Sequence, residues 1–482
     1  MRILNLILSA IVALALLAAC SDDDSFTPSA SRSLTFSVDT VKLDTVFSNV
    51  PTVTRSFWVY NKSGEGIRLS DVRLEKGNQT GFRINVDGTY LGPTTGFHTS
   101  DIELRNKDSI RVFVELTSPN NQSNTPQLVE DNIVFTHESG VVQRVNLNAY
   151  SWDALQLTNV HITRDSTLSA GTTPIIIYGG ITVDSAATLT IPAGTTLYFH
   201  ADAGIDVYGR LIADGDPDRN VVLRGDRIDR MFDYLPYDNV SGQWRGIHFH
   251  TSSYDNVMQY ADIHSTFDAV VVDSSDVARE KLTLFCTTIH NCQGYGLKSV
   301  NSRLHIINCQ ITNTLNDCLC LDGGWADVNA CTLAQFYPFD ANRGVALRFY
   351  STDHDLQLLY CQNSLITGYA DIEMIGQQGD SAAVFNYAFS HCIIRDTTSI
   401  ESVDTVKLFR KVTFENGTDT TIVNGKKHFR NIDTDNLRYD FRLDSISPAI
   451  GQADRDACPP YDRTGWLRDE TPDIGAYEYH QE

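Results

Sequence analysis

Two histidines near the middle of the chain are the residues best suited to proton transfer. His248 and His250 stand two positions apart, close to Trp244 and Arg245. Imidazole titrates near neutral pH, so His248 is a weak candidate for a general base. Trp244 is a candidate glycan contact, because its ring could stack on a sugar. The alternative is a solvent-facing strand edge with no catalytic role.

A second candidate site is acidic. Asp214, Asp216 and Asp218 occupy alternate positions, as carboxylates do in calcium-binding loops. The sixth position of such a loop is glycine, but here it is Arg219, and no glutamate follows to close the loop. Calcium is therefore only a weak candidate cofactor, a charged turn is the alternative, and we assign no metal ligand.

Internal repetition indicates which elements must position these residues. An apolar strand, a small residue and a further apolar position recur at intervals of 22 to 31 residues around Ala261, Cys286, Cys309, Cys331, Cys361 and Cys392. A repeat of this length is typical of a solenoid and suits one coil of a right-handed parallel β-helix. We predict such a β-helix over residues 152–430, with about eleven coils.

The cysteines of the repeat predict a packing role. If they share one register, their side chains stack inside the coils as a ladder, where free cysteine behaves as a small apolar residue. Cys318 and Cys320 are too closely spaced for a usual zinc site. We therefore expect buried structural thiols.

The repeats resemble those of the pectate-lyase-like superfamily, specifically parallel-β-helix-repeat lipoproteins of Bacteroidota. This fold hosts lyases, hydrolases, adhesins and inert stalks, so the resemblance does not define a function. The stretch from Asn316 to Gly324 resembles the D-D-C-x-A-I-x-x-G motif of polygalacturonase-like glycosidases, which use paired carboxylates. That resemblance implies Asp317 and Asp322 as weak catalytic candidates. However, Asn316 replaces the first acid, and neither G-H-G nor R-I-K occurs in the chain.

The N-terminus has the features of an export signal. Residues 1–19 combine Arg2 with an apolar run too short for a convincing membrane span. The segment ending in Cys20 resembles the bacterial lipobox, which implies that Cys20 is acylated and anchors the chain in a membrane. The following residues look like the surface-export signal of Bacteroidota lipoproteins, with a solvated acidic linker as the alternative: Ser21, Asp22, Asp23 and Asp24. We expect a tether over residues 20–33 and a lipid-anchored, surface-exposed location at the outer membrane.

Two further segments complete the organisation. Residues 34–151 contain about seven short alternating strand patterns, which predict a β-sandwich and resemble the immunoglobulin-like domains of the same lipoproteins. This domain is expected to be a spacer, with a glycan or protein contact module as the alternative. Residues 431–482 resemble a closing segment that caps the β-helix. Trp466 in that segment is a possible glycan contact.

Composition restricts the fold and the partners. The 482 residues contain 47 Asp, 13 Glu and 38 Lys plus Arg, which gives a net charge of −22. Aspartate favours turns over helices, so the chain is expected to be all-β: an immunoglobulin-like sandwich, a right-handed parallel β-helix and a C-terminal cap. The negative charge disfavours a nucleic-acid partner.

Two functions remain open from the sequence. The leading hypothesis is a non-catalytic interaction scaffold that binds a surface polysaccharide or an outer-membrane protein complex. The alternative is a polysaccharide-degrading enzyme, a lyase or a glycoside hydrolase, that acts in a groove of the β-helix. The lack of a complete set of catalytic residues favours the scaffold.

Overall fold

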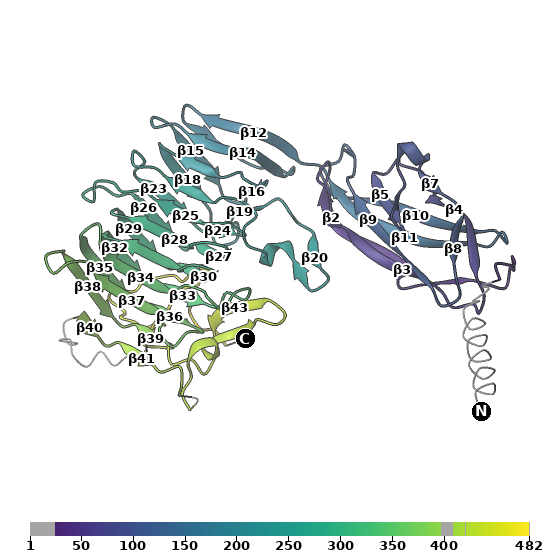
Figure 1. Cartoon of the computed structure of the whole chain (residues 1–482). Helices are drawn as coiled ribbons and strands as arrows, with labels where there is room; N and C mark the ends of the chain where they lie inside the picture. Colours follow the sequence, from purple (N-terminus) through teal and green to yellow (C-terminus); the bar gives the residue numbers. More distant parts are fainter. Residues whose placement is uncertain (1–24, 397–407, 420, 482) are drawn as a thin grey trace, which may run out of the picture. The chain divides into compact units, whose positions relative to one another are not determined.

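The computed structural model describes residues 25–396, 408–419 and 421–481 (Figure 1). The chain divides into two compact units, Met1–Asp153 and Ala154–Glu482. Within the described ranges all elements longer than one 3-10 turn are β-strands, as predicted, and no helix has the length and apolar character needed to span a membrane. The predicted signal, the anchor Cys20 and the export residues 21–24 lie outside the described residues.

The first unit is a sandwich of two β-sheets. One sheet has the order β1-β3-β9-β5-β6, and the other has the order β2-β11-β10-β4-β7, with β8 also paired to β4. Alternate residues of both sheets, such as Phe57, Val112 and Phe135, meet in one core. The elements are β1 (Leu34–Phe36), β2 (Thr40–Phe47), β3 (Arg55–Asn61), β4 (Ile67–Leu74), β5 (Phe82–Val86), β6 (Thr89–Tyr90), η1 (Pro93–Thr95), β7 (His98–Thr99), β8 (Ile102–Leu104), β9 (Ser109–Leu116), β10 (Gln127–His137) and β11 (Val142–Trp152).

The second unit is a parallel β-helix whose coils each add a strand to up to three faces. On face 1 the described residues contribute eleven strands, which agrees with the predicted number of coils. They are β12 (Leu155–Ile162), β14 (Ile175–Val183), β16 (Thr196–Phe199), β19 (Val221–Gly225), β24 (Ala261–His264), β27 (Thr288–Cys292), β30 (Gln310–Thr314), β33 (Thr332–Gln335), β36 (Leu365–Gly368), β39 (Ile393–Arg395) and β41 (Thr413–Glu415).

The other two faces follow the same parallel pairing. Face 2 begins with the second halves of β12 and β14 and continues with β17 (Ile205–Val207), β22 (Ile247–Phe249), β25 (Val270–Val272), β28 (Leu297–Val300), β31 (Leu319–Asp322), β34 (Leu347–Ser351) and β37 (Met374–Gln378). Face 3 contains β13 (Ser166–Thr167), β15 (Thr188–Pro192), β18 (Arg210–Asp214), β23 (Asn256–Gln259), β26 (Leu282–Phe285), β29 (Arg303–Ile307), β32 (Gly324–Asn329), β35 (Leu356–Gln362), β38 (Phe385–Ser390) and β40 (Phe409–Arg410).

The turn from face 3 to face 1 uses a left-handed residue in several successive coils. Asn308 and Asn363 have a φ of 52° at this turn. Asparagine tolerates this conformation better than other residues with a β-carbon, because its short side chain bonds locally. Inside the coils, a continuous apolar core runs from Ile162 to Phe409.

The predicted ladder of five cysteines is wrong in two of its members. Cys309, Cys331 and Cys392 share one register, in which Thr287 occupies the equivalent position in the coil before Cys309 and Ser364 that in the coil between Cys331 and Cys392. Cys286 instead occupies the left-handed turn position, with a φ of 47°, and its thiol donates to the Asp462 carbonyl. Cys361 lies on face 3, in register with Val328. The spacing of the cysteines could not show that Cys286 and Cys361 lie outside the common register, because the lengths of the turns differ between coils.

The structural role of the thiols leads to a reactivity prediction. All nine cysteines in the described ranges are free, eight are buried, and burial raises the pKa of Cys292 to about 12. Thiol reagents attack thiolates, so buried neutral thiols resist them. In a Cys20→Ser variant, a disulfide-exchange reagent is expected to label Cys458 alone in the native state and all nine thiols after unfolding in urea. Rapid native labelling of several thiols would contradict their burial.

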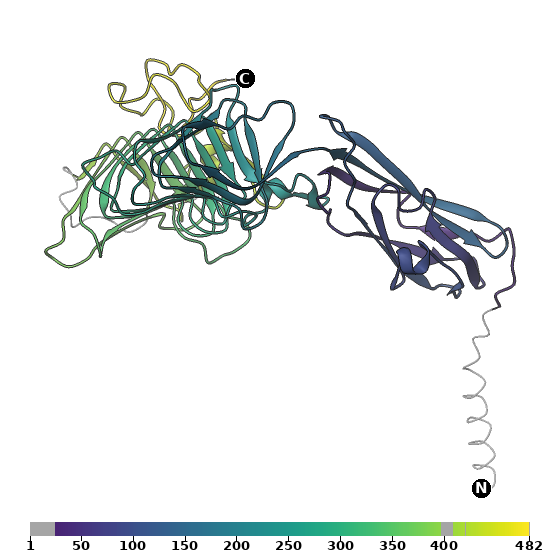
Figure 2. The same ribbon diagram turned by 90° about the horizontal axis from the view of Figure 1, so that it is seen from above.

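The C-terminal segment packs along the β-helix. It contains η3 (Gly425–His428) and the hairpin β42 (Phe429–Asp433) with β43 (Arg438–Leu443). Phe429, Phe441 and Ile474 form a core with residues of face 1, and Figure 2 shows the segment on one side of the coils. Arg463 extends this contact by donating to Asn220 Oδ1 at 2.7 Å. The segment predicted to cap the last coil therefore packs along the side of several coils.

Candidate functional site

A polar groove lies between face 1 and the C-terminal hairpin. Its volume is about 670 Å³, within the range of pockets that bind small molecules. The floor comes from β27 and β30, and one wall comes from β43 and the residues that lead into it. The lining residues are Asn239, Thr288, His290, Asn291, Gln310, Thr312, Asn313, Leu437, Arg438, Tyr439, Asp440, Phe441, Arg442, Thr464 and Tyr477.

The insertion between β19 and β22 helps to hold the hairpin over face 1. This insertion contains β20 (Arg230–Phe232), β21 (Leu235–Pro236) and η2 (Tyr237–Asn239). Asn239 Nδ2 donates to the Leu437 carbonyl at 3.0 Å, and Tyr477 Oη donates to Gln310 Oε1 at 2.5 Å. The groove thus has walls fixed by side-chain hydrogen bonds from both sides.

Two polar atoms of the groove have no hydrogen-bond partner among the described residues. They are Asn313 Oδ1, whose side chain is almost fully buried, and Tyr439 Oη, which lies on the hairpin. An unsatisfied buried polar group costs about 1–3 kcal/mol, so native proteins usually satisfy it with water or a ligand. Both atoms are closed to bulk solvent, and they are the two unsatisfied polar groups that a polar molecule seated deep in the groove would bond to.

The floor of the groove joins a histidine–aspartate cluster. His290 Nε2 lies 3.1 Å from Asp262 Oδ1, and the rings of His290 and His264 stack with centroids 4.8 Å apart. Burial and the neighbouring His290 lower the pKa of His264 to about 3, so this ring is neutral at physiological pH. Burial opposes ionisation of Asp262, but the charge and the hydrogen bond of His290 outweigh it and hold the pKa of that carboxyl well below its usual range. The three side chains are close enough together to share one metal ion.

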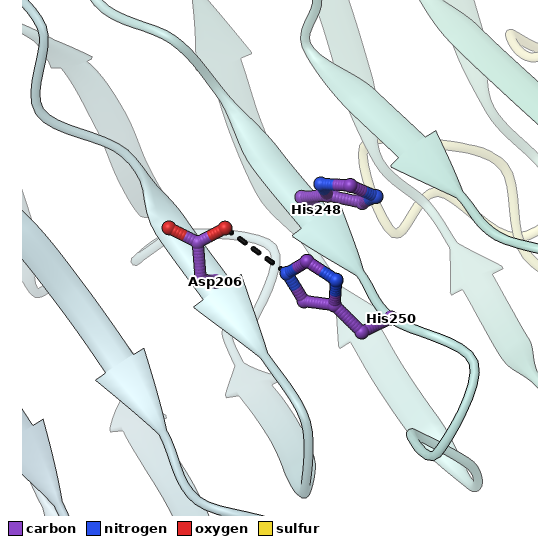
Figure 3. A group of neighbouring side chains, drawn as sticks. All are labelled: Asp206, His248 and His250. Atoms are coloured by element: carbon purple, nitrogen blue, oxygen red, sulfur yellow. Dashed lines mark hydrogen bonds and ion pairs between the residues drawn. The ribbon is translucent and has the colours of Figure 1, made fainter.

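The second such cluster contains the predicted base His248. Its members are Asp206, His248 and His250 on face 2, and their potential ligand atoms all lie within 4.8 Å of one another (Figure 3). His248 Nε2 is 2.8 Å from Asp273 Oδ1. The sequence indicated the two histidines but neither carboxylate, because Asp206 comes from the coil before and Asp273 from the coil after.

The two predicted catalytic aspartates, Asp317 and Asp322, lie in different surroundings. Asp317 is buried, and its carboxylate accepts from the Val345 N–H at 2.9 Å and from Arg348 Nε at 2.8 Å. These bonds tie both oxygens to the next coil, so the proposal of Asp317 as a catalytic group is corrected to a structural one. Asp322 lies at the end of β31 with its pKa raised by burial, 3.6 Å from His354 Nδ1.

The two tryptophans have opposite surroundings. Trp244 was expected to contact glycan, but only 2% of it is exposed, and its ring stacks on Phe199 inside the coil at 4.2 Å. That prediction is wrong, because Trp244 precedes β22 at a position that faces inward. Trp466 is 60% exposed beside His480, so its role as a glycan contact stays a prediction. Tyr477, by contrast, is part of the core that joins the C-terminal segment to face 1.

The acidic run around Asp216 forms a charged turn. The Asp216 carboxylate accepts hydrogen bonds from the backbone N–H and from the guanidinium of Arg219. Asp214 Oδ1 accepts a hydrogen bond from Gln259 Nε2 at 2.5 Å. Two of the three carboxylates are therefore bound to donors of the chain.

Comparisons with known proteins give limited information. Neither the family models nor the curated proteins that were searched match this chain. Among solved structures, pectate lyase Pel9A is similar with a TM-score of 0.29 and 10% identity, over 68% of this chain and 88% of that one. A family 123 glycoside hydrolase from Clostridium perfringens has a TM-score of 0.19 and 9% identity, and the match spans 28% of this chain and 30% of the hydrolase. A PapD-like domain of human CEP192 has a TM-score of 0.18 and 10% identity, over 27% of this chain and 92% of that domain.

Proposed function

We propose that this chain is a lipid-anchored surface protein that binds a glycan in the groove between face 1 and the C-terminal hairpin, without turning it over. The observation that carries the proposal is the pair of unpartnered polar atoms, Asn313 Oδ1 and Tyr439 Oη, in a groove of about 670 Å³. Sugars present many hydroxyl groups that both donate and accept hydrogen bonds. Such a ligand satisfies both atoms at once.

The composition of the groove supports binding over hydrolysis. A glycoside hydrolase places two carboxyl groups on either side of the scissile bond. Among the described residues that line this groove, Asp440 is the only carboxylate, and it forms a two-pronged ion pair with Arg442. Amides, hydroxyls and the rings of Tyr439, Phe441 and Tyr477 make up much of the remaining lining.

A glycan array probed with the purified protein tests the proposal. Binding is expected for the wild type and should weaken about tenfold in Asn313→Gly and threefold to tenfold in Tyr439→Phe, because each removes one hydrogen bond to the ligand. Glycine is the appropriate replacement for Asn313, since its φ of 55° strains other residues. Tyr360→Phe, on face 3, is the matched control and should bind as the wild type does.

Three results would contradict the proposal. The first is a wild-type protein that binds no glycan on an array that includes acidic and neutral polysaccharides. The second is binding that neither groove variant weakens. The third is turnover of a bound polysaccharide, which would place the protein among the enzymes.

A further inference from the structure

We propose that Asp206, His248 and His250 on face 2 form a binding site for one divalent transition-metal ion of the Zn²⁺ class. The site is independent of the glycan groove, which lies on face 1 and uses other residues. Its basis is a convergence of two imidazoles and one carboxylate from two adjacent coils (Figure 3).

The β-helix geometry brings the three ligands together. His248 and His250 alternate along β22 and its end, so both point outward on one face. Asp206 on β17 pairs in register with His248, which places the carboxylate one coil away. His250 Nε2 lies 3.0 Å from Asp206 Oδ1, and the two histidine rings have centroids 4.0 Å apart. At this distance one cation can bind both rings through the lone pairs of their nitrogens.

Neighbouring residues orient the ligands. Asp273 follows β25 in the next coil, with Oδ1 2.8 Å from His248 Nε2 and Oδ2 3.5 Å from His250 Nδ1. The Tyr208 ring is stacked on His250 at 4.0 Å with an angle of 2° between the planes. A carboxylate behind a ligating histidine fixes the ring and increases its basicity, as in many zinc sites. Asp273 and Tyr208 thus supply the support that a metal site needs.

The donor set selects the kind of metal. Imidazole nitrogen with one carboxylate suits Zn²⁺ and its neighbours, while Ca²⁺ prefers oxygen ligands alone. A cavity of about 230 Å³ adjoins Asp206 and His248, which leaves room for a water as a fourth ligand. Arg245 Nη2 donates to Asp206 Oδ2 at 2.9 Å, so Oδ1 is the oxygen directed at the metal position.

Titration calorimetry of the chelator-stripped, purified protein with ZnCl₂ tests the site. The wild type is expected to bind one Zn²⁺ per chain, and His248→Ala and His250→Ala are each expected to bind it at least tenfold more weakly. His305→Ala is the matched control, because His305 on face 3 also lies between two carboxylates, Glu280 and Asp327, and its loss should leave zinc binding unchanged. The visible spectrum of the Co²⁺-loaded protein should show four-coordinate geometry in the wild type and not in the two cluster variants.

Several results would overturn the proposal. They are a wild type that binds no Zn²⁺, and zinc binding that survives both His248→Ala and His250→Ala. A third is zinc binding that disappears in His290→Ala instead, which would place the metal at the cluster beside the groove. Thermal unfolding of each variant without metal shows whether it is folded, and Asp206→Asn provides a near-isosteric change if an alanine variant fails to fold.

Discussion

Replacing Arg468 with alanine is expected to lower the free energy of unfolding of the second unit by about 3–5 kcal/mol, because it breaks a buried ion pair. Arg468 Nη1 lies 3.1 Å from Glu478 Oε2, and both side chains are at most 3% exposed. The same guanidinium donates to the carbonyls of Asp473 and Gly475 and to Asn308 Oδ1. The variant leaves Glu478 charged and buried without its partner.

Urea unfolding followed by fluorescence measures this effect. Arg219→Ala is the control, because Arg219 also pairs with a carboxylate but is 69% exposed, and such surface pairs contribute about 0–1 kcal/mol. Arg468 attaches the C-terminal segment to the turn at Asn308, so its loss should also weaken glycan binding in the groove. A change below 1 kcal/mol would show that the segment is held by its apolar core alone.

Acid should destabilise the second unit through His264. Its pKa is about 3 in the folded state, because burial and His290 disfavour the charged form, against about 6.5 in the unfolded chain. The unfolded state therefore binds more protons between these values, and stability falls as the pH is lowered from about 6.5 toward 3. At pH 4 this one group removes about 3 kcal/mol of the stability that is present at pH 7.

A His264→Gln variant isolates this contribution. The difference in unfolding free energy between pH 7 and pH 4 is expected to be about 3 kcal/mol smaller in the variant than in the wild type. The comparison is made within each protein, so a general loss of stability in the variant does not affect it. Equal differences in the two proteins would mean that His264 is not kept neutral by its surroundings.

The sequence predicted the repeat architecture well, because one apolar pattern recurs in every coil. It also predicted the β-sandwich over residues 34–151, because strands such as β5 (Phe82–Val86) alternate strictly between buried and less buried residues. β2 lacks this strict alternation, because Asp44 adopts a φ of 56° and the pairing with β11 shifts there. A bulge of this kind reverses which residues face the core, so a period of two is lost.

The groove could not be predicted from the sequence for a different reason. It forms where the hairpin that ends at Leu443 folds back over coils that precede it by more than a hundred residues. A local pattern contains no information on which coils such a hairpin covers. One signal was available: Asn291 and Asn313 recur at equivalent positions of adjacent coils, both with a φ of 55°. An asparagine repeated in this way marks a left-handed position within the strands of face 1, and both asparagines line the groove.

The central claim, that the groove binds glycan, is tested most directly by locating the bound ligand. Hydrogen–deuterium exchange of the purified protein would be measured with and without the oligosaccharide that binds most strongly on the array. At a ligand concentration near the wild-type Kd, we expect slower exchange in residues 288–292, 310–314 and 437–442, which surround the groove, and a much smaller change in Asn313→Gly. Protection confined to face 2, to the sandwich or to the exposed surface around Trp466 would contradict it.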